Sequence, residues 1–154
     1  HSNGVLSRLH PTSIDDYKLP GLPGRGLIVI RFDTNEEPLL ICIVHLSLGR
    51  RARKLQLEFI SELIQEHSHL VVMGDFNCGV ESKELQDLVH NTHLQLPVEG
   101  AKTFPAWRPN RKYDHILISE ALKLKKARVL DHTHSDHLPI SVRVELPEGV
   151  YLKD

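Results

Sequence analysis

The sequence predicts a mixed α+β domain whose strands include antiparallel pairs. Two apolar runs of strand length lie close together at residues 26–32 and 39–46, and the polar turn at residues 35–38 separates them. This spacing is typical of an antiparallel hairpin. A helical pattern follows over residues 50–67. Further strand-like runs come later in the chain, at residues 70–74, 114–118, 127–130 and 138–146. This order lacks the regular strand–helix alternation of a parallel barrel.

Before the hairpin, residues 4–8 are expected to form a short strand, and residues 11–24 a polar loop that prolines interrupt. Residues 50–67 are expected to form an amphipathic helix because their apolar side chains cover one broad face. A second, short helix is expected at residues 81–89, with Ser82 as its candidate N-cap. The apolar face of the first helix consists of Leu55, Phe59, Ile60, Leu63 and Ile64.

Residues 91–112 are expected to form a long irregular loop. Long loops between strong strands often carry substrate contacts. Trp107 lies in this loop, where it is either a core residue or a platform for a base or ring at the rim of a cleft. The sequence leaves both interpretations open.

Length and composition describe a single domain of residues 1–154, large enough for a real core. The net charge is −1, which argues against binding to nucleic acid or an anionic membrane through a global basic field. No apolar stretch approaches bilayer length, so we expect a soluble protein without a transmembrane segment. The N-terminus lacks the features of a signal peptide. The cell compartment stays open, with a cytoplasmic location favoured.

Three residue types bear on the chemistry. The two cysteines, Cys42 and Cys78, are too few for a disulfide framework, and Cys42 lies in an apolar run, where a buried, reduced thiol is expected. The only methionine is Met73, so we expect a chain that was processed or truncated, or a fragment. The 11 histidines favour metal or acid–base chemistry.

Asp75 and Asn77 follow directly after the strand-like run at residues 70–74. In an extended chain, positions two apart point to one side, so a carboxylate and a carboxamide would face the same cleft. The carboxylate can bind a hard cation or a nucleophilic water, and the carboxamide can hold phosphate oxygens without repelling them. The structural alternative is an Asx turn that closes the strand.

Further polar residues stand at the ends of other strands. Asp136 and His137 begin the last strand-like run. Asp136 is a candidate metal ligand, and His137 is a candidate general base because imidazole titrates near neutral pH. Asp114 begins its own strand and could orient the His137 ring. His45 ends the hairpin and could act as an acid or as a donor to phosphate. Taken singly, Asp114 is better explained as a turn or capping residue. His45, taken singly, is better explained as a hydrogen-bonded histidine at the edge of a strand.

The segment Arg50-Arg51-Ala52-Arg53-Lys54 opens the predicted helix just after His45. A run of charges of this kind is by default a solvated helical face. Beside an active strand end it could instead attract phosphate.

A competing metal pattern overlaps the last motif. His132, His134, Asp136 and His137 match the H-x-H-x-D-H run of binuclear zinc hydrolases of the metallo-β-lactamase type, and imidazoles at this spacing suit zinc. In those enzymes the run opens a helix early in the fold, and further histidine ligands follow it. Here a strand-like run follows, and no histidine comes after His137. A binuclear zinc hydrolase is therefore the second hypothesis.

Taken together, the motifs resemble those of the endonuclease/exonuclease/phosphatase superfamily, which has the DNase I-like fold. The matching segments are Gly-Asp-Phe-Asn at 74–77, Tyr-Asp-His-Ile-Leu at 113–117 and Ser-Asp-His-Leu-Pro at 135–139. Residues 3–8 and 44–46 agree in order and approximate spacing. The resemblance covers essentially the whole chain, and the Gly-Asp-x-Asn and Ser-Asp-His motifs are specific as a pair.

The resemblance implies a four-layer α/β/β/α sandwich, in which helices flank two packed mixed sheets. It also implies hydrolysis of a phosphoester with Mg²⁺ or Mn²⁺, by a water that His137 activates while Asp114 orients the imidazole. The expected partner is a phosphoester substrate such as a nucleic acid or a phospholipid head group. DNA, RNA, phospholipid head groups and inositol phosphates are all processed on this scaffold, and the fold does not choose among them.

The resemblance implies roles for the remaining residues as well. His45 would be the acid or the transition-state donor. Asp75 and Asn77 would hold water and phosphate. Asp136 would bind the metal together with Asp75.

The chain departs from this superfamily at its start. Members are longer, and their first third carries a glutamate that is a principal metal ligand. No residue here matches that glutamate, or the carboxylate that normally partners the His45 position. We therefore expect the C-terminal portion of such a domain, incomplete in its metal site and inactive on its own if that glutamate is essential. The third hypothesis is a non-catalytic half-domain that binds a partner or self-associates through an exposed sheet edge.

Overall fold

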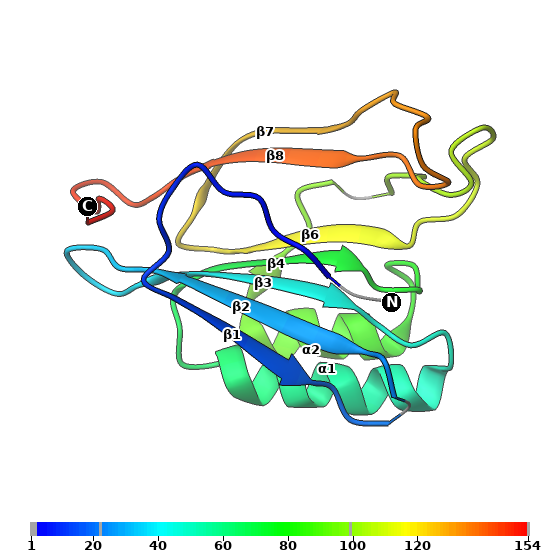
Figure 1. Ribbon diagram of the computed structural model, residues 1–154, viewed down its shortest axis with the longest axis horizontal. Coiled ribbons are helices and arrows are strands. Elements are labelled where there is room, and N and C mark those ends of the chain that lie inside the picture. The colour runs from blue at the N-terminus through cyan, green and yellow to red at the C-terminus, as the bar shows by residue number, and fades with distance from the viewer. Residues whose placement is uncertain (1–2, 22, 99, 154) are drawn as a thin grey trace.

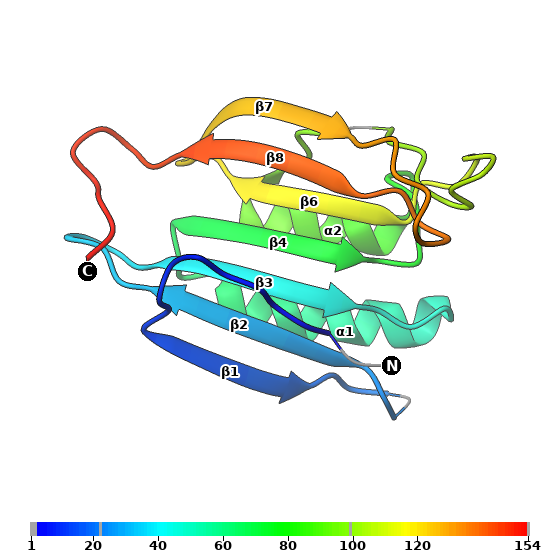
Figure 2. The same ribbon diagram turned by 45° about the horizontal axis from the view of Figure 1, so that its top comes forward.

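The computed structural model describes residues 3–21, 23–98 and 100–153. The strands span β1 Ser13–Lys18, β2 Gly26–Phe32, β3 Leu39–His45, β4 His69–Asp75, β5 Leu94–Gln95, β6 Asp114–Ser119, β7 Lys123–Val129 and β8 Ile140–Glu145. Six of them form a sheet in the order β1-β2-β3-β4-β6-β5, and β7 and β8 form a smaller sheet. Helices α1 (Arg50–Ile64) and α2 (Lys83–Thr92) cover one face of the larger sheet, and the smaller sheet lies against the other (Figures 1 and 2).

The described residues thus form three layers: the helices, the larger sheet and the smaller sheet. The four-layer sandwich that the resemblance implies has further helices outside the second sheet. Both helices of the described residues bury apolar side chains on the larger sheet, so neither covers the smaller one. The prediction that Leu55 belongs to the buried face of α1 is wrong, because Leu55 is 51% exposed and Leu57 is buried instead. No helix in this part of the chain has the length and apolarity to cross a membrane.

Most of the predicted elements are confirmed. β2 and β3 pair antiparallel, with Val29 opposite Cys42, as the two adjacent apolar runs predict. α1 then leads to β4, which runs parallel to β3, and β6 pairs antiparallel with β4. Ser82 stands at the N-cap position of α2, although its side chain makes no capping hydrogen bond.

Side-chain alternation in the larger sheet divides the core into two parts. The helix-facing part includes Leu40, Cys42 and Val44 of β3, which lie in one cluster with Ile60 and Ile64 of α1. Cys42 is buried and free, as predicted, and burial raises the pKa of its thiol to about 12.

The opposite face of the larger sheet packs on the smaller sheet. Val71 of β4 and Ile116 and Ile118 of β6 lie in one apolar cluster with Val142 and Val144 of β8. This cluster holds β8 over β4 and β6. The segment that precedes β8 is therefore brought to the ends of these two strands.

The prediction of the first strand is wrong. Residues 4–8 form no strand, and β1 lies instead within residues 11–24, which the sequence favours as a loop. β1 pairs with β2 alone among the described residues, and most of its side chains are exposed, so its sequence carries no apolar run. For the same reason β7 begins in a lysine-rich stretch before residue 127. The two-residue strand β5 falls inside the predicted loop.

Charges occupy the outer edge formed by β1. Asp15, Asp16 and Lys18 all lie in this strand and are exposed. Charged side chains on an edge strand oppose pairing with a second chain. The hypothesis of self-association through an exposed sheet edge stays a prediction.

A glycine is required where β4 passes β3. Gly74 has a φ of 142°, and a Cβ at this position would lie 1.9 Å from the carbonyl oxygen of Val44. That oxygen belongs to the backbone of β3, so it cannot move aside as a flexible side chain would. The close approach immediately precedes the paired strand ends His45 and Asp75.

Gly74→Ala is expected to lower the free energy of unfolding by roughly 2 to 5 kcal/mol, because the added methyl group forces β3 and β4 apart. Urea denaturation followed by circular dichroism measures this change. Gly4→Ala is the matched control, since a Cβ there meets nothing within 4 Å; its effect should stay below about 0.5 kcal/mol. Equal stability of the two variants would contradict the close approach.

Candidate active site

The register of three neighbouring strands sets three polar residues in a row. His45 ends β3, Asp75 ends β4 and Asp114 begins β6. His45 pairs with Asp75, and Asp75 pairs with Asp114. Since adjacent strands lie about 4.8 Å apart, the row is about 10 Å long. By the alternation of each strand, all three side chains point to the face that carries the smaller sheet.

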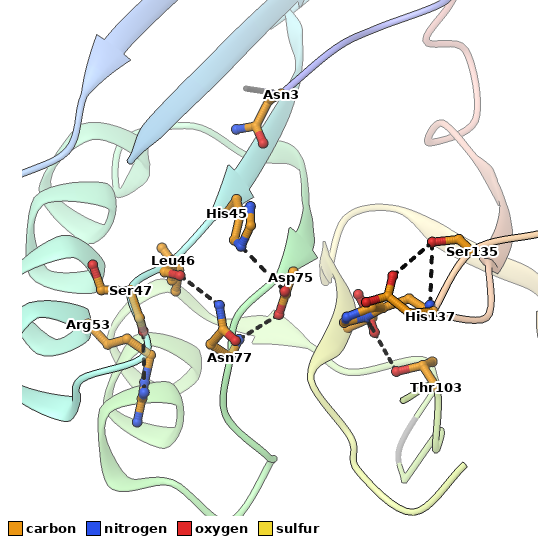
Figure 3. A network of polar contacts seen from close by, with 12 residues as sticks. Asn3, His45, Leu46, Ser47, Arg53, Asp75, Asn77, Thr103, Ser135 and His137 are labelled. Atoms are coloured by element: carbon orange, nitrogen blue, oxygen red, sulfur yellow. Dashed lines mark hydrogen bonds and ion pairs between the residues drawn. The ribbon is translucent and has the colours of Figure 1, made fainter. Parts of the chain in front are cut away.

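His137 joins this row from the other sheet. It lies in the segment before β8, and its Nδ1 is 2.7 Å from Oδ2 of Asp114. At the other end of the row, Nε2 of His45 lies 3.5 Å from Oδ2 of Asp75. Figure 3 shows Asp75 between His45 and His137. The structure thus brings two carboxylates and two imidazoles together at one end of the sheet, in the order His45, Asp75, Asp114 and His137.

The predicted long loop holds the Asp114–His137 pair in place. The Thr103 hydroxyl, which is fully buried, donates a hydrogen bond to Oδ2 of Asp114, and the Thr103 carbonyl accepts one from the Leu138 backbone at 2.8 Å. The Phe104 ring lies 4.7 Å from the His137 ring, centroid to centroid. Sequence reasoning missed Thr103, because a threonine in a loop carries no signal of its own.

Asp75 and Asn77 form the turn that was the structural alternative for this pair. Oδ1 of Asp75 accepts a hydrogen bond of 2.8 Å from the Asn77 backbone, and Asn77 has a positive φ of 52°. Nδ2 of Asn77 donates to the Leu46 carbonyl at 2.8 Å. The turn therefore aims the Asn77 carboxamide at the end of β3, and one of its two N–H groups is already used there.

Side chains of α1 hold the loop after β3 in place. Gln56 is fully buried; its Oε1 accepts from the Ser47 backbone at 2.9 Å and its Nε2 donates to the Ser47 hydroxyl at 2.9 Å. Arg53 donates to the Ser47 and Leu48 carbonyls and pairs with Glu84 of α2 at 2.8 Å. The expectation of a solvated basic face is thus wrong for Arg53, because a buried acidic partner lies on the neighbouring helix.

A histidine that the sequence left without a role holds the next loop. His115 follows Asp114 but points to the helix side of β6, where it is buried. Its Nε2 lies 2.7 Å from the Cys78 carbonyl, and its ring meets the edge of Phe76 at a centroid distance of 5.3 Å. Burial lowers the pKa of His115. A neutral imidazole therefore anchors the segment just after Asn77.

Burial and charge move the pKa values of the site in different directions. Burial raises the pKa of Asp75, and the nearby Asp114 carboxylate adds to the rise. Burial lowers the pKa of His45, and the Arg25 cation lowers it further. At His137 burial opposes protonation, but the hydrogen bond and charge of Asp114 outweigh it, so the pKa of His137 is raised. The two site histidines therefore titrate apart.

Carboxylates are the side chains in this part of the chain that would suit a hard cation. Asp75 and the exposed Asp136 offer carboxylate oxygens, and Mg²⁺ in proteins is often held by one or two carboxylates plus water. The raised pKa of Asp75 reflects in part its repulsion by Asp114, which a cation would relieve. The described residues contain no group of three or more His, Cys, Asp or Glu side chains placed to hold a metal ion.

The structure also places the histidines of the zinc pattern and the tryptophan of the predicted loop. His132 and His134 are exposed and stack with ring centroids 6.4 Å apart, while His137 is engaged with Asp114. Trp107 is 74% exposed, so its interpretation as a core residue is wrong. Its role as a platform for a ring stays a prediction.

The sequence profile of the endonuclease/exonuclease/phosphatase family matches residues 1–137. The chain belongs to this family. Its members are generally metal-dependent hydrolases of phosphoesters. The family assignment agrees with the resemblance and favours it over the zinc hydrolase hypothesis. The comparison with curated proteins gives no match.

Solved structures show the same fold. The mannosyl-6-phosphatase of Bacteroides thetaiotaomicron superposes with a TM-score of 0.74 at 19% identity, over 89% of this chain and 67% of that one. The human Nocturnin catalytic domain with bound sulfate gives 0.72 at 20% identity, over 89% and 60%. The inositol polyphosphate 5-phosphatase domain of SPsynaptojanin, in complex with inositol (1,4)-bisphosphate and calcium ion, gives 0.67 at 19%, over 91% and 55%. At these identities the likeness establishes the fold, and the chain spans 55% to 67% of the three structures.

Asp114→Asn is expected to lower the pKa of His137, because it removes the carboxylate that raises it. An NMR titration of the imidazole Cε1–H signals in the presence of EDTA measures the shift. Asp131→Asn is the control, since Asp131 is exposed and lies in the same segment of the chain. A His137 pKa that is the same in both variants would contradict the pairing of His137 with Asp114.

Proposed function

We propose that these residues form the active centre of a Mg²⁺- or Mn²⁺-dependent phosphoesterase that hydrolyses its substrate with a water activated by His137. The row His45, Asp75, Asp114, closed by the hydrogen bond from His137, is the observation that carries the proposal. Family membership and the DNase I-like fold support it.

In the proposed mechanism, His137 is the general base. Its Nδ1–H donates to Asp114, which leaves the Nε2 lone pair free to take a proton from water. The Asp114 carboxylate then stabilises the imidazolium that forms. Thr103 and Phe104 keep this pair in one orientation.

The other end of the row would act on the phosphoryl group. His45 has a lowered pKa, so near neutral pH it is a neutral imidazole that can donate one hydrogen bond to a phosphoryl oxygen. The free N–H of Asn77 would donate a second one. Asp75 and Asp136 are the residues that would hold the metal ion, which when bound would neutralise negative charge on the phosphoryl group.

The substrate class within the phosphoesters is not narrowed by the fold. The proposed partners are nucleic acid, phospholipid head groups and phosphorylated sugars, and the exposed Trp107 would suit a flat ring. A comparison of bis(p-nitrophenyl) phosphate with p-nitrophenyl phosphate separates diesterase from monoesterase activity.

His137→Ala and Asp75→Ala are each expected to reduce Mg²⁺-dependent turnover by about 10²- to 10⁴-fold, the usual effect of losing a general base or an electrostatic group. The assay uses both nitrophenyl esters and the natural gene product that contains this chain. Circular dichroism checks that the variants fold. EDTA should abolish activity, and added Mg²⁺ or Mn²⁺ should restore it.

His134→Ala is the matched control, because it removes an exposed histidine from the same segment. The proposal predicts unchanged turnover in this variant. Loss of activity in His134→Ala together with stoichiometric bound zinc would favour the binuclear zinc hydrolase. Full activity of His137→Ala would overturn the proposed mechanism.

A further inference from the structure

A cavity of about 560 Å³ opens beside His45 at the end of the sheet where β1 turns into β2. His45 lines this cavity and also belongs to the strand-end row, so the cavity borders the His45 end of the row. The charged side chains around the cavity are Asp16, Lys18 and Arg25. Two cations and one carboxylate give it a net positive charge at neutral pH.

The Arg25 guanidinium lacks a full set of acceptors. Its Nη1 is buried, and no acceptor among the described residues lies within hydrogen-bond distance of it. A buried, unpaired N–H group of a cation carries a substantial desolvation cost. The Arg25 backbone is tied down, since its carbonyl accepts a hydrogen bond from Leu19 at 3.1 Å. Arg25 thus has an anchored backbone, lines the cavity and carries one N–H group that no described residue accepts.

In-line displacement decides which part of the substrate would reach this cavity. In the proposed mechanism the water is activated at the His137 end of the row, so the leaving group must depart on the opposite side of the phosphorus. His45 stands at that opposite end, about 10 Å away by the spacing of the strands. The cavity beyond His45 is therefore on the side of the leaving group.

We propose that this cavity binds an anionic group carried by the leaving alcohol, most simply a second phosphate, and that Arg25 is its main contact. Arginine suits this role because its planar fork binds phosphate oxygens in pairs. Lys18 adds a second positive charge to the lining of the cavity. This inference rests on the proposed function, because it takes the direction of attack from it.

The test measures binding rather than turnover. Inositol 1,4-bisphosphate and inositol 1-phosphate are titrated into the metal-free chain while the backbone amide signals are followed by NMR. The bisphosphate is expected to bind at least about tenfold more tightly, the scale of one charge-assisted hydrogen bond. Its additional shifts should fall on residues 16–19 and 24–28. Arg25→Gln is expected to remove the difference between the two probes, and Arg25→Lys to retain part of it.

Arg31→Gln is the matched control, because Arg31 lies at the far end of β2 and is partly exposed beside Asp33. It should keep the full preference for the bisphosphate. Equal affinities of the two probes, absence of binding, or a preference that survives Arg25→Gln would each overturn the inference. Catalysis by His137→Ala would overturn the proposed function instead, while the preference for the bisphosphate, measured without metal or turnover, would still report on the cavity.

Discussion

The register between β3, β4 and β6 is the constraint on which the candidate site depends. It places His45, Asp75 and Asp114 level with one another at a single end of the sheet. A shift of one residue in β4 would turn Asp75 toward the helices and remove it from the row. Gly74 permits the close passage of the two strands just before this point, where a Cβ would strike the backbone of Val44. The polar chemistry therefore depends on a backbone contact that contains no functional side chain.

Each end of the row is then held by a different layer. The helices fix the His45 end, because the buried Arg53–Glu84 pair and Gln56 leave the loop after β3 little freedom. Removing one partner of such a buried pair is strongly destabilising. The apolar contact of β8 with β4 and β6 fixes the His137 end. The site thus needs both sheets, although every carboxylate in the row comes from the larger one.

Most of the fold and part of the candidate site could be predicted from local sequence patterns. The hairpin of β2 and β3 and the strand ends at Asp75 and Asp114 follow from apolar runs that end at polar residues, and α1 follows from its helical periodicity. β1 could not be predicted in this way, because an exposed edge strand needs no apolar run. The burial of Arg53 could not be predicted either, because it depends on Glu84, which lies 31 residues away in the chain. Thr103 and Arg25 likewise gain their roles from partners or cavities that only the folded chain brings to them.

The unequal environments of the two histidines fit the different roles proposed for them. His137 faces carboxylates that raise its pKa, whereas His45 is partly buried near the Arg25 cation and has a lowered pKa. Near neutral pH, His45 is therefore suited to donate a hydrogen bond as a neutral imidazole rather than to deliver a proton. A cation bound at Asp75 would offset the carboxylate charge and lower the pKa of His137, which would free its lone pair at a lower pH. A single cation at Asp75 would thus both offset negative charge on the phosphoryl group and lower the pKa of His137, the proposed general base.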